Sequence, residues 1–188
     1  MKKIITKTLL LLSLFISITS SQLNAQALTT ADIKAQMVKE WERSKAYTID
    51  YLNTMPANKY SFKAVDSIRS FAQQMLHLAS ANVFFMSLAT DQKAPSSSFG
   101  QDLEQRVSAQ TKDSVMYYVT TSYDYAISAA KSSDITKWGE KKKLPFGGYE
   151  ETRYALINKA IEHQAHHRGQ TTIYIRLQGI KPPQERLF

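Results

Sequence analysis

The 188-residue sequence contains no cysteine, and this absence removes several kinds of structure. Disulfide bonds, thiolate metal ligands and lipid attachment to an amino-terminal cysteine are all excluded. Glycine and proline are scarce too, at six and five residues, and most of them lie between segments with helical spacing. No glycine-rich phosphate loop or nucleophile elbow is present. Any metal site must therefore do without thiolate ligands.

The sequence also lacks an apolar stretch long enough to cross a bilayer. The longest apolar run covers residues 9–18 and is interrupted by two serines, whereas a helical span needs roughly twenty residues. Lysines precede this run, and Ala25-Gln26-Ala27 follows it, which is the plan of a secretory signal peptide. We predict a signal peptide over residues 1–25, cleaved after Ala25 or Ala27, in preference to a membrane anchor. The mature protein is then expected to be periplasmic or secreted, without stable insertion in the membrane.

The remainder, residues 26–188, is long enough for one domain with a substantial core. Without the three lysines of the first seven residues, the formal charge falls from +8 to +5. The basic residues are scattered, and the tightest group, Lys141-Lys142-Lys143, lies in an expected loop. A nucleic-acid-binding surface needs a basic stripe with interleaved aromatic or base-reading groups. None is present, so we expect no nucleic-acid partner.

The spacing of apolar residues predicts an all-α fold, an antiparallel bundle of four helices. Thr29 or Thr30 can cap the first helix, which Pro56 ends. The remaining three are expected to begin near Asp66 or Ser67, at Thr111, and near Tyr149-Glu150-Glu151, the last ending before Gly179. Residues 101–109 are expected to form a short helical lead-in, and 91–100 and 131–149 to form loops.

The most informative stretch is residues 162–170, which holds three of the four histidines. His163 and His167 are four residues apart, so they project from one face of a helix and can share a metal ion. Both fall on the seam predicted to face the core, where leucine is usual. This seam is Leu156, Ala160, His163, His167, Gln170, Tyr174 and Leu177.

The fourth histidine, His77, lies in the second predicted helix. On its face of the helix, apolar residues follow it one and two turns later, and a polar residue precedes it by one turn. Buried imidazoles are costly unless their nitrogens find partners. We therefore predict a metal site of His77, His163 and His167. Three neutral imidazoles would leave one coordination position for water or a substrate atom.

Several alternatives remain at this point. His166 can replace either seam histidine, and the histidines can instead be purely structural, satisfied by tyrosines or water. Glu162 and Gln170 are candidates for groups that support the ligands. A zinc-protease motif requires glutamate directly after the first histidine, but Gln164 stands there, and glutamine cannot act as a base.

The stretch from His163 to Gln170, HQAHHRGQ, followed by IRLQGIKPP at residues 175–183, resembles the last helix of the DinB/YfiT-like superfamily. The upstream MLHLASAN at residues 75–82 is similar to the histidine motif of that family's second helix. The resemblance covers residues 30 to 183. It implies a four-helix bundle with a long crossover connection, often a homodimer. It also implies a divalent cation, Ni²⁺ or Zn²⁺, held by the residues matching His77, His163 and His167.

The resemblance implies several kinds of activity. Some members are S-transferases that use a low-molecular-weight thiol, and one is a mycothiol-dependent maleylpyruvate isomerase. A metal-dependent hydrolase or thiol-type transferase acting on a small molecule is therefore the leading hypothesis. The alternative is a non-catalytic metal- or ligand-binding bundle of the cell envelope. A strip of small residues, Ala165, Gly169 and Thr172, would allow a second helix to approach closely in a homodimer.

Overall fold

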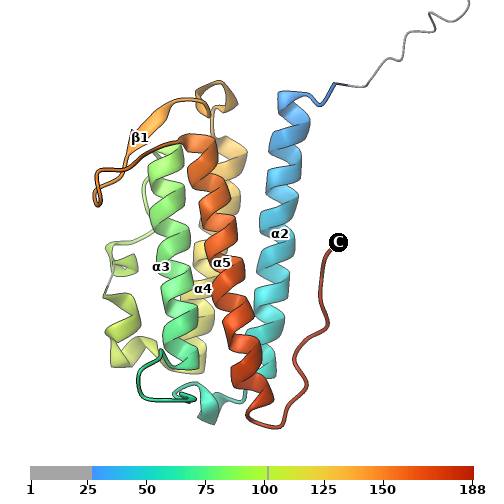
Figure 1. The fold of residues 1–188 in the computed structure, drawn as a ribbon, viewed down its shortest axis with the longest axis vertical. Helices are drawn as coiled ribbons and strands as arrows, with labels where there is room; N and C mark the ends of the chain where they lie inside the picture. Colours follow the sequence, from blue (N-terminus) through green and yellow to red (C-terminus); the bar gives the residue numbers. More distant parts are fainter. Residues whose placement is uncertain (1–26, 101) are drawn as a thin grey trace, which may run out of the picture.

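The computed structural model describes residues 27–100 and 102–188, so the predicted signal peptide at residues 1–25 lies outside it. The described chain forms four long helices, as predicted (Figure 1). They are α2 (Thr30–Thr54), α3 (Phe71–Thr90), α4 (Lys112–Ser132) and α5 (Arg153–Arg176). Two short strands, β1 (Lys141–Lys143) and β2 (Glu150–Thr152), pair antiparallel. The short 3-10 helices are η1 (Ala57–Lys59), η2 (Ser97–Phe99), η3 (Leu103–Gln105), η4 (Val107–Ala109) and η5 (Ile135–Lys137).

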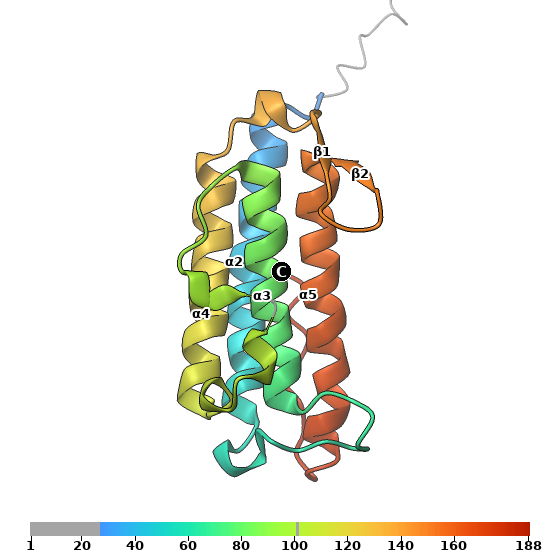
Figure 2. The ribbon, with the colours of Figure 1, turned by 90° about the vertical axis from the view of Figure 1, so that its left-hand side faces the viewer.

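The helices form a bundle in which α2 and α5 run one way and α3 and α4 run the other (Figures 1 and 2). Helices α2 and α3 each pack against both α4 and α5. Since α3 and α4 point the same way, the chain between them, residues 91–111, must return along the length of the bundle (Figure 2). This is the long crossover that the family resemblance implied. Among the described helices, none has the length and apolar character needed to span a membrane.

Side-chain caps fix where the helices begin. Thr29 forms a capping box with Asp32, and the Thr111 hydroxyl accepts a hydrogen bond from the Ser114 amide, so α2 and α4 start as predicted. The predicted start of α3 near Asp66 or Ser67 is wrong. Ser70 caps this helix by a reciprocal capping box with Gln73, which begins it several residues later. A cap with its partner three residues on outweighs an isolated polar residue upstream.

The predicted start of α5 near Tyr149-Glu150-Glu151 is also wrong, because these acidic residues belong to strand β2. In the hairpin, Lys142 lies opposite Glu151 and Lys143 opposite Glu150. Opposite charges across strands stabilise such pairs, so the lysine cluster expected in a loop forms β1 instead. Thr152 then caps α5 by accepting from the Ala155 amide. At its far end α5 closes as predicted, with Gly179 at φ 75° and the Ile180 amide bonded to the Ile175 carbonyl.

The core contains a polar cluster that faces away from the histidines. The Gln164 side chain accepts hydrogen bonds from the Tyr123 hydroxyl, at 2.7 Å, and from Arg168, at 2.5 Å. It also donates to the Ser44 hydroxyl. Arg168 is buried and lies over the ring of Tyr47, with 4.7 Å from the guanidinium carbon to the ring centroid. Buried polar groups are retained when their partners are also buried.

This cluster shows that the predicted seam of α5 is partly wrong. Gln170 and Leu177, placed on the seam, are exposed. The buried face is instead rotated toward Gln164 and Arg168, and its other members are Leu156, Ile157, Ala160, His167, Thr171, Tyr174 and Ile175. The predicted seam did not include Gln164 or Arg168, whereas hydrogen bonds with Ser44 and Thr48 of α2 and with Tyr123 of α4 satisfy these side chains in the interior. His163 and His167 consequently lie on the side of the buried face that points toward α3.

Candidate metal centre

The antiparallel packing of α3 against α5 brings three histidines together. His77 comes from α3, and His163 and His167 come from consecutive turns of α5. The ring centroids of His77 are 5.0 Å from His163 and 4.6 Å from His167, and those of His163 and His167 are 4.4 Å apart. One nitrogen from each ring lies within 4.8 Å of the others. The structure thus contains the predicted three-histidine group, which can hold a metal ion.

The spacing of the two α5 histidines fits a shared cation. Their Nε2 atoms are 3.2 Å apart. A tetrahedral centre with metal–nitrogen distances of about 2.0–2.1 Å requires its ligand nitrogens to be about 3.3 Å apart. The helix therefore presents these two nitrogens with nearly the separation that one ion requires, before any side chain moves.

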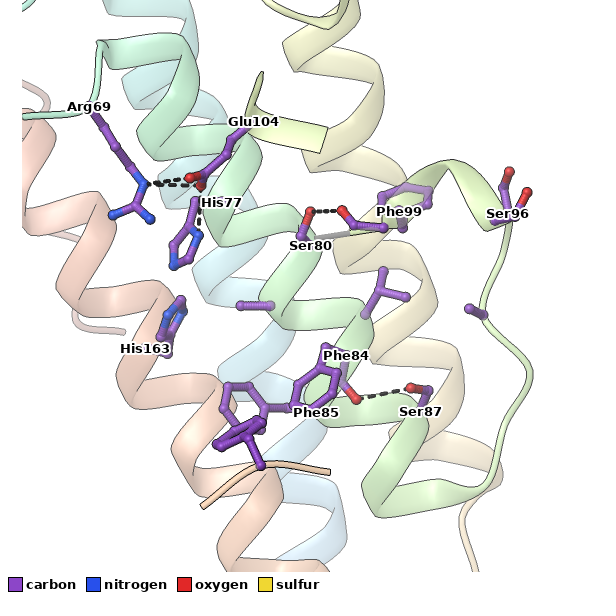
Figure 3. Close-up of a pocket in the computed structure, with 16 residues that line it drawn as sticks. Arg69, His77, Ser80, Phe84, Phe85, Ser87, Ser96, Phe99, Glu104 and His163 are labelled. Atoms are coloured by element: carbon purple, nitrogen blue, oxygen red, sulfur yellow. Dashed lines mark hydrogen bonds and ion pairs between the residues drawn. The ribbon is translucent and has the colours of Figure 1, made fainter. Parts of the chain in front are cut away.

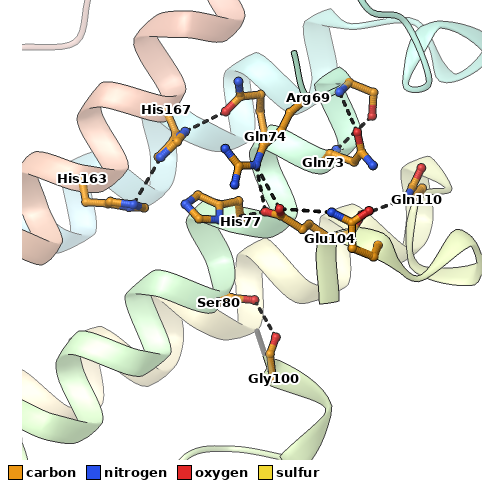
Figure 4. Close-up of polar contacts among 12 residues, drawn as sticks. Arg69, Gln73, Gln74, His77, Ser80, Gly100, Glu104, Gln110, His163 and His167 are labelled. Atoms are coloured by element: carbon orange, nitrogen blue, oxygen red, sulfur yellow. Dashed lines mark hydrogen bonds and ion pairs between the residues drawn. The ribbon is translucent and has the colours of Figure 1, made fainter. Parts of the chain in front are cut away.

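Hydrogen bonds orient two of the three rings. The Nδ1–H of His167 donates to Gln74 Oε1 at 2.7 Å, and the Nδ1–H of His77 donates to Glu104 Oε2 at 2.7 Å (Figure 4). With the proton on Nδ1, each Nε2 keeps its lone pair. Ligating histidines typically have such support on the nitrogen that does not bind metal. Gln74 and Glu104 are themselves buried, so the rings are held firmly.

The third ring is not satisfied by the protein. The Nδ1 atom of His163 is buried and has no hydrogen-bond partner among the described residues. Without a cation, His163 must donate from Nε2 to His167, because the proton of His167 is on Nδ1. That arrangement leaves the Nδ1 lone pair of His163 desolvated, which is costly. A cation bound by both Nε2 atoms would require the His163 proton to lie on Nδ1, and it would then use the Nε2 lone pairs of both rings.

Burial keeps the three imidazoles neutral. It lowers the pKa of His163 to about 4 and that of His167 to about 3, and the neighbouring histidines contribute in the same direction. Burial and the Arg69 guanidinium lower the pKa of His77, although Glu104 opposes the shift. Since a metal binds the neutral ring, these ligands need not lose a proton at neutral pH.

The crossover supplies the carboxylate of the site. Glu104 lies in η3 and is held from outside by Arg69, whose Nε is 3.1 and 3.0 Å from the two carboxylate oxygens. Gln110 donates to the Glu104 backbone carbonyl and so fixes the same segment. Arg69 precedes the cap of α3, so the start of that helix and the crossover are joined at His77.

Two of the three histidines, His77 and His163, lie in the wall of a cavity of about 580 Å³ between α3, α5, the crossover and the β hairpin (Figure 3). His77 and His163 reach it directly. On the other side of the Arg69–Glu104 pair is a more polar groove, to which Gln74, His166 and His167 contribute. The centre is therefore accessible to a small molecule from the cavity.

The other residues considered from the sequence lie elsewhere. His166 is exposed and outside the three-histidine group, although its ring centroid is 5.0 Å from that of His167. Glu162 and Gln170, expected to support the ligands, are both exposed. Gln74 and Glu104 have that role instead. Gln74 carries a signal, because it precedes His77 by one turn, but Glu104 lies in a segment with no regular spacing.

Gln164 settles the question of a zinc-protease arrangement. Its side chain is buried among Ser44, Tyr123 and Arg168, away from the three rings. The position after the first histidine thus faces a different side of α5 from the candidate metal ligands. Neither the residue type nor the location fits a general base at this centre.

Comparison with known proteins agrees with this architecture. The sequence model of the DinB family matches residues 26–186. The chain belongs to the DinB family. Among solved structures, it resembles a DinB-like protein (YjoA) from Bacillus subtilis, with a TM-score of 0.60 and 18% identity over 81% of this chain and 96% of that one. A DinB-like protein from Bacillus cereus gives a TM-score of 0.63 with 15% identity, over 79% of this chain and 95% of that one. No curated protein matches the sequence.

Proposed function

We propose that this DinB-family protein is an exported metal-dependent enzyme that acts on a small molecule, as a hydrolase or a thiol-type transferase. His77, His163 and His167 would hold a divalent cation, Ni²⁺ or Zn²⁺. The observation that carries the proposal is the orientation of the imidazoles. Gln74 and Glu104 direct two Nε2 lone pairs to the point where His163 also presents a nitrogen.

The donor set is consistent with catalysis rather than with a closed structural site. In the described part of the chain, the three histidines form the whole group that could ligate an ion. A cation held there would supply a Lewis acid, which polarises a bound water, thiol or carbonyl oxygen. The cavity gives a substrate access to His77 and His163, which both line it. The second candidate, a non-catalytic binding bundle, requires the same ligands but no turnover.

Elemental analysis of protein purified without an affinity tag tests the centre. We expect close to one Ni²⁺ or Zn²⁺ per chain in the native protein and almost none in a His163→Ala/His167→Ala variant. His166→Ala is the matched control, because His166 is exposed and outside the group. Equal metal content in the native protein and the double variant would refute the site.

Activity assays separate the enzyme from the binding protein. The metal-loaded protein should accelerate either ester hydrolysis or the addition of a small thiol to an electrophile, and His163→Ala/His167→Ala should abolish the reaction. Metal binding without turnover across both reaction classes would favour the non-catalytic candidate. A metal-loaded structure with a fourth protein ligand would have the same implication.

Export is tested separately. Mass spectrometry of the cell-envelope fraction should detect a chain that begins after Ala25 or Ala27. An intact amino terminus retained in the cytosol would contradict this part of the proposal while leaving the metal centre unaffected.

A further inference from the structure

The cavity beside the histidines is chemically divided along its length. Its charged lining residues, within the part of the chain that the structure describes, are Arg69 and Glu104, and both lie at the end beside His77 (Figure 3). The rest of the lining is apolar or carries only serine hydroxyls. A ligand that fills this space must match a charged end and an uncharged remainder.

The uncharged end is built from aromatic rings. Phe84 and Phe85 come from α3, with ring centroids 5.2 Å apart, and Phe85 is 6.0 Å from the ring of His163. Phe146, from the loop of the β hairpin, stacks on Phe84 with a centroid distance of 6.0 Å and an interplanar angle of 28°. Phe146 is 49% exposed, although large apolar side chains gain from burial. A flat apolar group entering the cavity would cover these rings.

The positions on α3 set the distance between the two ends. Phe84 is seven residues after His77, which corresponds to about 11 Å along a helix. A ligand that reaches from Arg69 and His77 to the ring of Phe84 is therefore about the length of a ring with a short chain attached.

Arg69 presents hydrogen-bond donors at the charged end of the cavity. Its Nε is used by Glu104, but neither terminal nitrogen donates to any residue in the described ranges. The side chain is 39% exposed, so these terminal nitrogens can be reached. The Arg69–Glu104 pair is neutral, the histidines are neutral, and a divalent cation would make this end positive. A guanidinium with free terminal nitrogens is well suited to a carboxylate.

We infer that the ligand of this cavity is an organic carboxylate with an apolar body of aromatic size. The carboxylate lies against Arg69 and the histidine centre, and the body packs against Phe84, Phe85 and Phe146. This inference names the substrate class of the proposed function and rests on the same cavity.

Calorimetric titration with three probes tests the inference: 4-phenylbutyrate, the neutral 4-phenylbutanol, and butyrate, which has no ring. We expect 4-phenylbutyrate to bind at least about tenfold more tightly than either of the others. Equal affinity for the acid and the alcohol would overturn the charged end. Equal affinity for 4-phenylbutyrate and butyrate would overturn the aromatic end.

Variants assign each end. Arg69→Gln should reduce the preference for the acid over the alcohol to about twofold or less, while Arg69→Lys retains part of it. Arg106→Gln is the matched control, because Arg106 is also half-exposed and paired with a carboxylate but does not line the cavity. Phe146→Ala, in an exposed loop, should weaken both phenyl ligands by a similar factor. An unchanged preference in a folded Arg69→Gln protein would refute the role of Arg69.

The two proposals fail separately. The titrations are run on metal-loaded and on chelator-treated protein. A carboxylate preference in a protein that binds no metal would sustain this inference and refute the metal centre. One metal per chain without that preference would refute this inference and leave the metal centre standing.

Discussion

Glu104 and Gln74 determine which nitrogen of His77 and of His167 faces the centre of the three-histidine group. Each accepts a hydrogen bond from an Nδ1–H at 2.7 Å, so the Nε2 lone pairs of His77 and His167 point inward. A carboxylate in this position also makes the imidazole a stronger donor to a cation. The affinity of the three-histidine group for a cation would therefore depend on residues that do not contact the cation.

Glu104→Gln is expected to weaken metal binding by about 10–100-fold, because the His77 Nδ1–H loses a charged acceptor. Competition with a chromogenic chelator measures the change. Glu162→Gln is the control, because Glu162 is exposed on α5 one residue before His163. The metal affinity of this control variant should stay within about twofold of the native value. Equal affinities for all three proteins would show that Glu104 has no influence on the centre.

The depressed pKa values of the histidines predict how acid affects the metal-free protein. The pKa is about 4 for folded His163 and about 3 for folded His167, against about 6.5 in an unfolded chain. From about pH 7 to pH 5 the unfolded chain takes up protons that the folded chain does not, so the free energy of unfolding must fall as the pH falls. Urea titrations of chelator-treated protein should show this decrease. A His163→Gln/His167→Gln variant should show a shallower one, and an identical slope would contradict the assignment.

The sequence predicted the grouping of the three histidines better than it predicted their surroundings. His163 and His167 share a turn-to-turn spacing, so their common direction follows from helix geometry alone. The support from Glu104 depends on how a 21-residue connection, residues 91–111, folds against α3, and no local pattern encodes that. The predicted seam of α5 omitted Gln164 and Arg168 for a related reason. Their burial is possible because Ser44 and Tyr123 meet them from other helices.

At the scale of elements, helix starts were predicted to within one residue where the candidate caps were adjacent, as for Thr29 and Thr30, or single, as for Thr111. Thr29 and Thr111 start α2 and α4 as expected. For α3, three polar residues within five positions could serve, and the capping box of Ser70 with Gln73 is the one used. The β hairpin was missed because its strands are only three residues long, and its pairing depends on contacts between residues 141–143 and 150–152.

Ser70→Ala should lower the free energy of unfolding by about 1 kcal/mol, because the Gln73 amide loses its acceptor at the start of α3. Ser67→Ala, at the position where the spacing alone placed the start, should change it by less than about 0.5 kcal/mol. Chemical denaturation monitored by circular dichroism measures both. A larger effect for Ser67→Ala than for Ser70→Ala would mean that the helix begins earlier in solution.

At the scale of the whole molecule, the outer face of α5 suggests self-association. Thr172 of the predicted strip is partly buried, and its hydroxyl is hydrogen-bonded to that of Tyr51, so it does not belong to this face. Ala165 and Gly169 are exposed, and Ile173 and Leu177, which are 56% and 55% exposed, continue their four-residue spacing. A Cβ atom added to Gly169 would meet no other atom within 4 Å, so this part of the surface is open. Small and apolar residues in one row allow two helices to approach closely. The homodimer thus remains a prediction with a defined surface.

Ile173→Glu should convert such a dimer to monomers, raising its dissociation constant by about tenfold or more, because a charge would be buried at the contact. Light scattering coupled to size exclusion measures the mass. Val107→Glu is the control, because Val107 is also exposed and apolar but lies on the crossover. A monomeric native protein at working concentration, or a dimer that survives Ile173→Glu, would exclude this surface.

The crossover divides the molecule into a part that holds the histidines and a part that shapes what reaches them. Helices α3 and α5 present the three rings. Much of the cavity wall comes from the crossover, through Ala94, Ser96, Ser97, Phe99, Gly100 and Glu104. An insertion or replacement in this connection would change the shape of the cavity offered to a ligand without changing how the four long helices pack. The shape of the cavity can thus be altered by changing a single surface segment, provided that Glu104 keeps its hydrogen bond to His77.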